Sequence, residues 1–276
     1  MNWYIVQAYS GFENKVADNI KDIMAKNSLQ NNLGEILVPT QKVVEVKKGK
    51  RTQKEKKYNS NIPKIIFQTS KEKIPKYVQK IIKQKTTGWK YIYFSDQNII
   101  KYLKKNPLEE FPDIIDKFNY FDNGAHKADL FRYYYLYING GVFIDSDAIF
   151  EKNIEFIIKD YDFVSVKSIV PDTLFNGFIA TTKKNPIIYN ALKLLYKTSN
   201  KKLKKNYHLV CKQFLNVYEK YKNKNSILLY EYHDRRLDNI CVKTYDNWNR
   251  HVITHFSWCK KIPKNFDYRS KFYCDN

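Results

Sequence analysis

The 276-residue sequence contains little cysteine, and its cysteines show no metal-binding spacing. Cys211, Cys241, Cys259 and Cys274 all lie in the last quarter of the chain and form no CxxC pair. This pattern argues against a structural zinc site, which usually draws its thiolates from such pairs. We therefore predict reduced, partly buried thiols, as in cytosolic proteins.

Long apolar runs are also missing. No segment approaches the roughly 18 apolar residues that a membrane-spanning helix needs. The opening residues, MNWYIV, show no basic segment followed by an apolar one, so no secretory signal is visible. We expect a cytoplasmic protein, with peripheral contact at the inner face of a membrane as the alternative.

Acidic residues are scarce relative to basic ones. The chain has 28 Asp and Glu against 49 Lys and Arg, a net charge of +21. Such a charge favours anionic partners. However, the excess is spread evenly: residues 1–58 hold 11 basic and 6 acidic residues, and the remainder holds 38 and 22. An AT-rich coding sequence produces this kind of even bias, so we expect an anionic small ligand and no nucleic acid.

The chain divides near residue 60 into two unlike pieces, which we assign as domains 1–58 and 59–276. In the first piece, apolar spacing predicts strands at 3–8, 34–38 and 43–46 and an amphipathic helix at 11–26. The charged run KKGKRTQKEKK, residues 47–57, predicts a solvated loop or hairpin tip.

After residue 60, predicted strands and helices alternate. Strands are expected at 65–67, 91–94, 142–144, 161–166 and 178–182, and helices at 97–105, 113–120, 124–139, 185–197 and 207–222. Gly140 and Gly141 end the helix at 124–139, as glycine commonly does. This alternation predicts an α/β fold with a layered sheet.

Two carboxylates follow the apolar strand in GGVFIDSDAIF, residues 140–150. If the strand continues, Asp145 and Asp147 point to the same side at its carboxyl end, where open α/β sheets bind ligands. The two charges would repel each other unless a cation lies between them, and Mg²⁺ or Mn²⁺ suits such oxygen donors. A metal placed there serves the departure of a phosphate or diphosphate. On spacing alone, a loop of solvated acids is the better explanation.

The wider sequence resembles a known family. HKADLFRYYYLYINGGVFIDSDAIF resembles the DxD region of glycosyltransferases, the group that includes alpha-1,6-mannosyltransferase-like enzymes and capsular sugar transferases. IPKIIFQT, WKYIYFSD and NGFIATTKKNP resemble further segments of the same family, in order, over about residues 62–186. The resemblance implies a GT-A-like, nucleotide-sugar-binding sheet flanked by helices and a Mn²⁺ (or Mg²⁺) cofactor. It also implies a UDP-sugar or GDP-mannose donor, a glycan or lipid-linked acceptor, and retention of anomeric configuration.

Transferred residue by residue, this resemblance gives Asp145 and Asp147 the metal, with Asp145 also touching the ribose. Asp129 and Arg132 match the family's D-x-x-R-Y and would line the nucleotide site, although a simple i,i+3 ion pair on a helix is the alternative. Gln68 would lie near the nucleotide, with a turn amide as the alternative.

Two further segments complete the expected site. Asn176 and Gly177 belong to the segment that faces the acceptor in the family. In THFSW, His255 would be a third metal or phosphate contact, with a surface histidine as the alternative. Ser257 and Trp258 would close over the diphosphate, although a place in the hydrophobic core is the better explanation of Trp258 on general grounds. Ser70 stands where the family usually has Trp, which removes a stacking surface.

The first piece resembles a different family. WYIVQAYSGFENKVADNI and GEILVPTQKVVEVKKGKRTQKEKK are similar to the N-terminal domain of NusG-type transcription elongation factors. The family's FPGY segment and later strands do not follow, so we expect a partial α+β fragment that does not bind RNA polymerase. A transcription elongation or antitermination module is the alternative function. A nuclease or phosphodiesterase and an inactive sugar-binding remnant are further alternatives.

Overall fold

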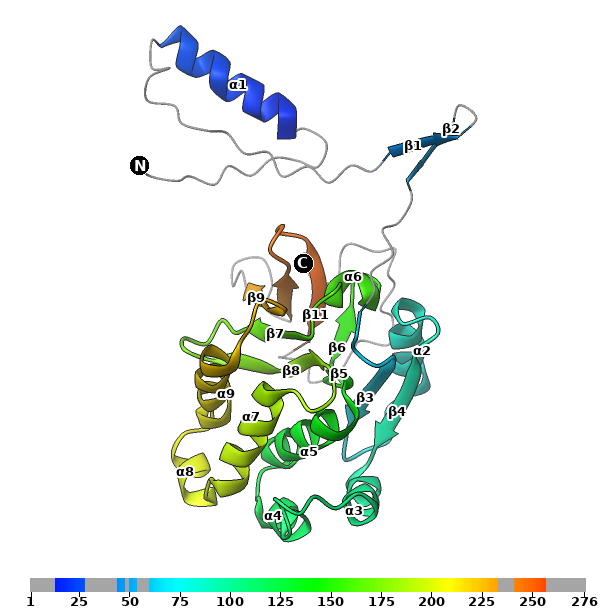
Figure 1. Cartoon of the computed structure of the whole chain (residues 1–276), viewed down its shortest axis with the longest axis vertical. Helices are drawn as coiled ribbons and strands as arrows, with labels where there is room; N and C mark the ends of the chain where they lie inside the picture. Colours follow the sequence, from blue (N-terminus) through cyan, green and yellow to red (C-terminus); the bar gives the residue numbers. More distant parts are fainter. Residues whose placement is uncertain (1–12, 28–43, 48–49, 54–59, 233–240, 257–276) are drawn as a thin grey trace. The chain divides into compact units, whose positions relative to one another are not determined.

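The computed structural model describes residues 13–27, 44–47, 50–53, 60–232 and 241–256 (Figure 1). The chain forms two compact units, the N-terminal unit Met1–Lys57 and the C-terminal unit Tyr58–Asn276. The assignment of domains 1–58 and 59–276 as separate functional parts stays a prediction.

In the N-terminal unit, helix α1 spans Glu13–Lys26 and confirms the predicted amphipathic helix. Strands β1 (Val44–Lys47) and β2 (Lys50–Gln53) form an antiparallel hairpin with Lys47 opposite Lys50. The described residues of the charged run, 47 and 50–53, therefore lie in the strands of a hairpin, and the predicted hairpin tip lies outside the described residues. The strands predicted at 3–8 and 34–38 lie outside the described residues.

The C-terminal unit is built on one mixed sheet of nine strands in the order β4-β3-β5-β8-β7-β9-β10-β11-β6. β3 is parallel to β4 and β5, β7 is parallel to β9, and the other pairs are antiparallel. The strands are β3 (Ile65–Thr69), β4 (Lys90–Phe94), β5 (Gly141–Ile144), β6 (Ala148–Phe150), β7 (Phe163–Lys167), β8 (Leu174–Thr181), β9 (Ser226–Tyr232), β10 (Val242–Tyr245) and β11 (His251–His255).

The order of the strands requires this sheet to curl. β5 is third and β6 is last in the sheet, yet residues 145–147 alone connect them. In a flat sheet, six strand spacings of about 4.8 Å would separate them by roughly 29 Å. Four residue steps reach at most about 14 Å. The far edge of the sheet must therefore bend back toward β5, and the Asp-Ser-Asp turn lies where the two meet.

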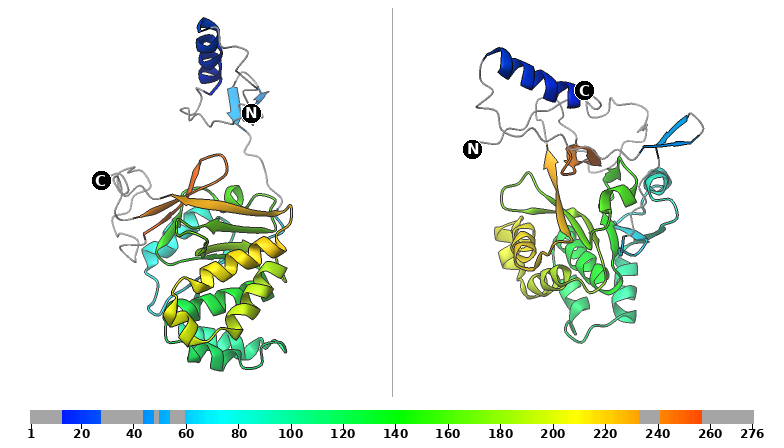
Figure 2. Two further views of the ribbon diagram at one scale, coloured as in Figure 1. Left: turned by 90° about the vertical axis from the view of Figure 1, so that its left-hand side faces the viewer. Right: turned by 45° about the horizontal axis from the view of Figure 1, so that its top comes forward.

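Helices cover both faces of the sheet. α5, α7 and α9 pack side by side against one face (Figure 1, Figure 2), while α2 packs against β6. The helices are α2 (Lys76–Lys85), α3 (Asp96–Lys105), α4 (Ile114–Tyr120), α5 (Gly124–Asn139), α6 (Ile154–Ile158), α7 (Pro186–Lys197), α8 (Asn200–Lys205) and α9 (Leu209–Tyr221).

Neighbouring side chains in the central strands enter different cores. Phe67 and Phe143 join the core beneath α5, whereas Ile66, Val142 and Ile144 join the core on the opposite face. Side chains alternate between the two faces of a strand, and every residue of β5 is buried. The predicted α/β layered sheet is thus confirmed, with its central strand covered on both sides.

Helix α5 and strand β5 are joined by two glycines in conformations that other residues rarely adopt. Gly140 has φ 63° and Gly141 has φ 101°. A side chain on Gly141 would approach the Ile65 carbonyl oxygen to 2.7 Å. The tight joint brings the helix back along β5 and confirms the predicted end of the helix.

Some expectations are corrected by the fold. The sequence predicted no strands beyond residue 182, whereas β9, β10 and β11 complete the sheet. Cys211 is a free thiol, but Cys241 is disulfide-bonded, so the prediction of reduced thiols is wrong there. Among the described residues, no helix combines the length and the apolar character that crossing a bilayer requires.

Candidate active site

Asp145, Ser146 and Asp147 form a turn between β5 and β6. The Asp145 N–H donates to the Gly177 carbonyl at 2.8 Å, and the Ala148 N–H donates to the Asp145 carbonyl at 3.2 Å. The predicted strand therefore stops at Ile144, and the expectation that strand alternation aligns the two carboxylates is wrong. A turn brings them together instead.

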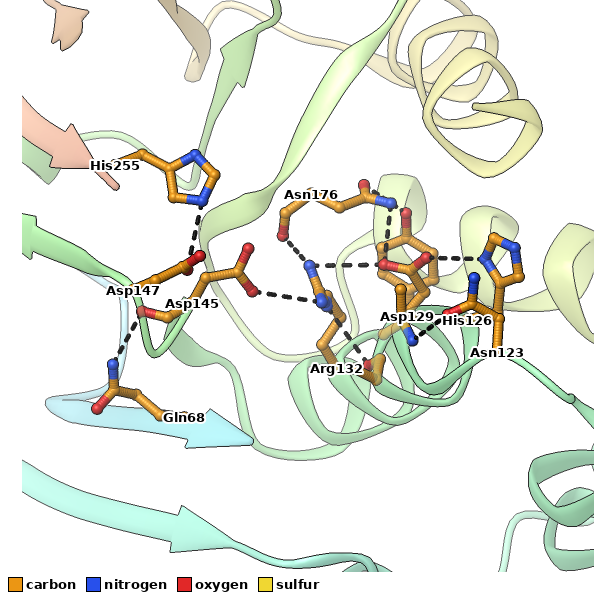
Figure 3. Close-up of polar contacts among 12 residues, drawn as sticks. Gln68, Asn123, His126, Asp129, Arg132, Asp145, Asp147, Asn176 and His255 are labelled. Carbon is orange, nitrogen blue, oxygen red and sulfur yellow. Dashed lines mark hydrogen bonds and ion pairs between the residues drawn. The ribbon is translucent and has the colours of Figure 1, made fainter. Parts of the chain in front are cut away.

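His255 reaches this turn from the other end of the sheet. β11 pairs with β6 so that His255 is opposite Ala148, and the Phe256 N–H donates to the Asp147 carbonyl at 2.9 Å. His255 Nε2 lies 3.3 Å from Asp147 Oδ1 (Figure 3). The histidine side chain is only 14% exposed. It therefore lies half-buried beside the turn, and the alternative of a surface histidine is contradicted.

Burial and neighbouring charges shift the pKa values of Asp145 and His255. Burial raises the pKa of Asp145, the Arg132 charge lowers it, and the Asp147 charge raises it, so that the pKa ends above its usual value. Burial alone lowers the pKa of His255, but its hydrogen bond with Asp147 and the charge of that carboxylate outweigh burial and raise it. Both shifts favour the protonated forms, that of Asp145 chiefly because of its burial and that of His255 because of Asp147.

The three side chains fit a divalent cation. One ligand atom from each of Asp145, Asp147 and His255 lies within 4.8 Å of the others. The side chains of Asp145 and Asp147 are 28% and 19% exposed to solvent, so a ligand can reach them. Carboxylate oxygens suit Mg²⁺ and Mn²⁺, and an imidazole nitrogen in the same set suits Mn²⁺ better than Mg²⁺.

Arg132 connects helix α5 to the turn. Its guanidinium lies 3.5 Å from Asp129 Oδ1 and 3.5 Å from Asp145 Oδ1, and it also donates to the Asn176 carbonyl. Burial lowers the pKa of Arg132, but the charges of Asp129 and Asp145 outweigh it, so the pKa is raised. The i,i+3 ion pair therefore exists, but it is one part of a network that reaches the turn.

Asn176 is held by the same network. The Tyr133 hydroxyl donates to Asn176 Oδ1 at 2.8 Å, and Asn176 Nδ2 donates to Asp129 Oδ1 at 3.1 Å. All of these side chains are buried. His126 Nδ1 lies 3.6 Å from the other oxygen of Asp129. A row of polar side chains thus runs from Asp145 through Arg132 and Asp129 to His126 (Figure 3).

Gln68 fixes the backbone of the turn. Its Nε2 donates to the Asp145 carbonyl at 2.9 Å, and its Oε1 accepts from the Tyr91 hydroxyl at 2.8 Å. The side chain is completely buried in β3. Both ends of the amide are engaged by the protein, so the structure gives Gln68 a positioning contact, and contact with a nucleotide stays a prediction.

Gly177 lies beside the Asp145 carboxylate. A Cβ at this position would collide with Asp145 Oδ2 and with the ring of Phe175. The Phe175 ring in turn packs on His255, with 4.7 Å between the ring centroids. The glycine thus provides the space in which the carboxylate lies.

Sequence reasoning missed Glu231 on β9. Its Oε2 accepts from Ser168 Oγ at 2.7 Å and from the Ile169 N–H at 3.1 Å. Burial raises its pKa, the two hydrogen bonds and the charge of His255 lower it, and Asp145 raises it further. No motif surrounds Glu231, and only strand pairing brings it within electrostatic range of the turn.

The structure thus brings together eight of the predicted site residues: Gln68, Asp129, Arg132, Asp145, Asp147, Asn176, Gly177 and His255. Ser257 and Trp258 lie outside the described residues. Substrate contacts of all these residues stay predictions.

Two family models match parts of this chain. Residues 71–164 match the family model described as "Glycosyltransferase sugar-binding region containing DXD motif", and residues 1–106 match that of "Transcription termination factor nusG". A solved structure, "PaToxG Glycosyltransferase", aligns with TM-score 0.43 and 19% identity, covering 58% of this chain and 69% of that one.

Curated relatives of this chain include NusG transcription termination/antitermination proteins. The one from Vibrio vulnificus (strain CMCP6) is 43% identical over 56 residues, 20% of this chain and 31% of the relative. That of Escherichia coli (strain K12) is 41% identical over the same shares. The one from Buchnera aphidicola is 29% identical over 161 residues, 54% of this chain and 78% of the relative. The chain thus spans about a third of the first of these relatives.

The two family matches overlap over residues 71–106. The structure resolves the overlap, because β4 pairs in parallel with β3, which pairs with β5 in the nine-stranded sheet. Residues 71–106 therefore belong structurally to the C-terminal unit. The chain thus carries a region that matches the DXD-type glycosyltransferase model and an N-terminal segment that matches the NusG model, as both resemblances predicted.

Proposed function

We propose that this chain, with its DXD-type glycosyltransferase region, is a metal-dependent retaining glycosyltransferase. It moves a sugar from a nucleotide-sugar donor, a UDP-sugar or GDP-mannose, to a glycan or lipid-linked acceptor. The observation that carries the proposal is the convergence of Asp145, Asp147 and His255, whose ligand atoms lie within 4.8 Å of one another. The resemblance to DXD enzymes supports retention, and no nucleophile is assigned.

Asp145, Asp147 and His255 would hold the cation, Mn²⁺ or Mg²⁺. When bound, the cation supplies positive charge that stabilises a departing diphosphate. The contribution of the protein is to fix the ligands beforehand. Gln68 holds the Asp145 carbonyl, and the Gly177 carbonyl holds the Asp145 N–H. Such fixed donors need no rearrangement when the ligand binds.

Arg132 and Asp129 would line the donor site beside the metal. Arg132 contacts Asp145 and thereby orients that carboxylate. Because Arg132 is buried between Asp129 and Asp145, its position is set by two ion pairs rather than by solvent. This arrangement leaves the orientation of the Asp145 carboxylate dependent on α5.

A donor screen tests the proposal. The full chain is incubated with UDP-sugars and GDP-mannose in Mn²⁺, in Mg²⁺ and in EDTA, and released nucleotide is measured. We expect release with at least one donor that depends on the cation, and proton NMR of the transferred sugar should show the anomeric configuration of the donor. Absence of cation-dependent release with every donor would remove the proposed function.

The NusG-like segment supports a second candidate function in transcription. Within the described part of the N-terminal unit, it supplies α1 and the β1–β2 hairpin, and an isolated hairpin is only marginally stable. From residue 65 onward, the chain forms strands of the nine-stranded sheet of the C-terminal unit. We therefore expect no capture of RNA polymerase by the full chain in a pull-down. Stoichiometric capture would establish the transcription role instead.

A further inference from the structure

A cavity of about 500 Å³ lies at the N-terminal end of α5, beside α8. Its lining includes the side chains of Asp122, Asn123, His126, Asn200, Lys204 and Tyr207. This volume is within the usual range of small-molecule binding pockets. None of the contacts assigned above to the cation or the donor uses this space.

The cavity adjoins the proposed active site through His126. This side chain is buried, lines the cavity, and places Nδ1 3.6 Å from Asp129 Oδ2. Nδ1 makes no hydrogen bond within the described part of the chain. Asp129 contacts Arg132, which contacts Asp145. His126, which lines the cavity, thus lies at one end of the polar row, and the candidate metal site lies at the other (Figure 3).

The electrostatics of Tyr207 agree with this placement. Burial first, and then the charges of Asp129, Cys211 and Asp145, raise the pKa of the Tyr207 hydroxyl. An occupant of the cavity would lie next to the donor-lining residues and not on a remote surface.

The charged groups of the cavity are already paired. Lys204 Nζ lies 2.7 Å from Asp122 Oδ2, and His126 faces Asp129. A phosphate or carboxylate ligand would have to displace Asp122 from Lys204 or lie against an acid. The pairing therefore favours a ligand without net charge.

The remaining groups suit the hydroxyls and the apolar face of a sugar. Tyr207 is 56% exposed, and its ring packs at 5.7 Å from that of His126, which fixes its orientation. Asn123, which lines the cavity, uses Oδ1 to accept from the Ala125 N–H, and its Nδ2 is left as a donor. Asn200 donates through Nδ2 to the Tyr120 carbonyl, which leaves its Oδ1 as an acceptor. An aromatic face flanked by amide donors and acceptors fits a pyranose ring.

We propose that this cavity binds a neutral glycan, which is the acceptor of the sugar transfer, with Tyr207 as its stacking surface. The inference rests on the proposed function, because it takes the donor to lie at Asp145, Arg132 and Asp129. The cavity, which adjoins Asp129 through His126, is then left for the acceptor.

The test separates glycan binding from donor chemistry. Saturation-transfer NMR of the full chain with mannotriose, maltotriose and triacetylchitotriose measures binding, and nucleotide release in water measures donor hydrolysis. We expect binding of at least one trisaccharide, weakened about tenfold in Tyr207→Ala because the stacking surface is lost. Tyr207→Phe keeps the ring and should bind as the wild type does.

Tyr232→Ala is the matched control, because Tyr232 is 52% exposed and lies on β9, outside the cavity lining. Donor hydrolysis should be unchanged in all of these variants. Three results would overturn the inference: no trisaccharide binding, binding insensitive to Tyr207→Ala, or a loss of donor hydrolysis in Tyr207→Ala. Failure of the wild type to hydrolyse any donor would instead remove the proposed function, since the NMR measurement needs no donor.

Discussion

Gly177 lies directly against the carboxylate of Asp145. Its carbonyl accepts the Asp145 N–H at 2.8 Å, and an added Cβ would collide with Asp145 Oδ2. The two residues are therefore close in two ways: their backbones share a hydrogen bond, and the Asp145 carboxylate occupies the space that a Cβ at position 177 would need. Any side chain at position 177 must move a proposed metal ligand.

Gly177→Ala is expected to weaken the site while leaving the fold intact. The atoms that its Cβ would meet belong to the ends of the Asp145 and Phe175 side chains, which can move aside. We expect Mn²⁺ affinity, measured by titration calorimetry, to fall about tenfold or more because a ligand is displaced. The circular dichroism spectrum should match that of the wild type. Unchanged Mn²⁺ affinity would contradict the assignment of Asp145 as a ligand.

Asp147→Asn should abolish most donor turnover in a folded protein. The substitution keeps the shape of the side chain but removes a formal charge from the cation site, whose share of leaving-group stabilisation is several kcal/mol. Turnover should fall about 100-fold or more. Asp96→Asn is the control, because Asp96 lies in the first turn of α3 outside the cluster. Equal turnover in the Asp147 variant and the wild type would refute the metal-dependent mechanism.

Arg132→Met is expected to destabilise the protein strongly. The guanidinium is 5% exposed and lies between Asp129 and Asp145, so its removal leaves two carboxylates without their cationic partner. Breaking a buried ion pair in this way costs about 3–5 kcal/mol. Urea unfolding measures the loss, and the double variant with Asp129→Asn should recover part of it. A double variant no more stable than Arg132→Met would show that charge is not the cause.

Glu231 should make stability depend on pH. Burial raises its pKa above the ordinary value of 4.5. Between that value and the raised one, the native protein keeps a proton that the unfolded chain has released. The free energy of unfolding therefore falls as the pH rises through this window. Above the window, the ionised carboxylate destabilises the native state fully.

Glu231→Gln removes this charge and keeps an oxygen that can accept from Ser168 and the Ile169 N–H. We expect the variant to be more stable than the wild type near neutral pH. The difference should shrink toward zero as the pH falls below 4.5, where the wild-type carboxyl becomes protonated in the unfolded state as well as in the native one. Urea unfolding across this range measures it. A stability difference that does not vary with pH would rule out titration of Glu231 as its origin.

Residues 59–276 should fold without the N-terminal unit. The three hydrophobic core clusters draw their described residues from 62–256. Expression of 59–276 should give a soluble protein with one cooperative thermal transition. If the shortened chain is molten while the full chain is cooperative, the N-terminal unit completes the core.

Local signals in the sequence were enough to predict α5, β5 and the position of the acidic turn. The apolar stripe of 124–139, the two glycines and the apolar run after them all lie within about 25 residues, and each is explained by neighbours in the chain. For the same reason, the resemblance to DXD enzymes was visible in that stretch. What local patterning got wrong was the link from Asp145 to Asp147, which is a turn and not a strand.

The surroundings of the turn could not be derived from patterning. His255 reaches Asp147 because β11 pairs with β6, more than 100 residues earlier in the chain. Glu231 is brought near by the pairing of β9 with β7. Such pairings depend on how the whole sheet closes, and no short segment of one sequence records them. The family resemblance predicted His255, whereas neither local patterning nor the resemblance indicated Glu231.

The curl of the sheet also links metal binding to stability at a distance. Asp145 follows the third strand in the sheet, and His255 lies in the eighth. A cation bound by both residues therefore links two strands that only the curl of the sheet brings together. A ligand at a hundredfold excess over its Kd, binding the folded state alone, stabilises that state by about 2.7 kcal/mol. The coupling is reciprocal. Substitutions that loosen β9 or β10 would therefore lower metal affinity without touching a ligand, and a full set of ligands would not by itself guarantee a working enzyme.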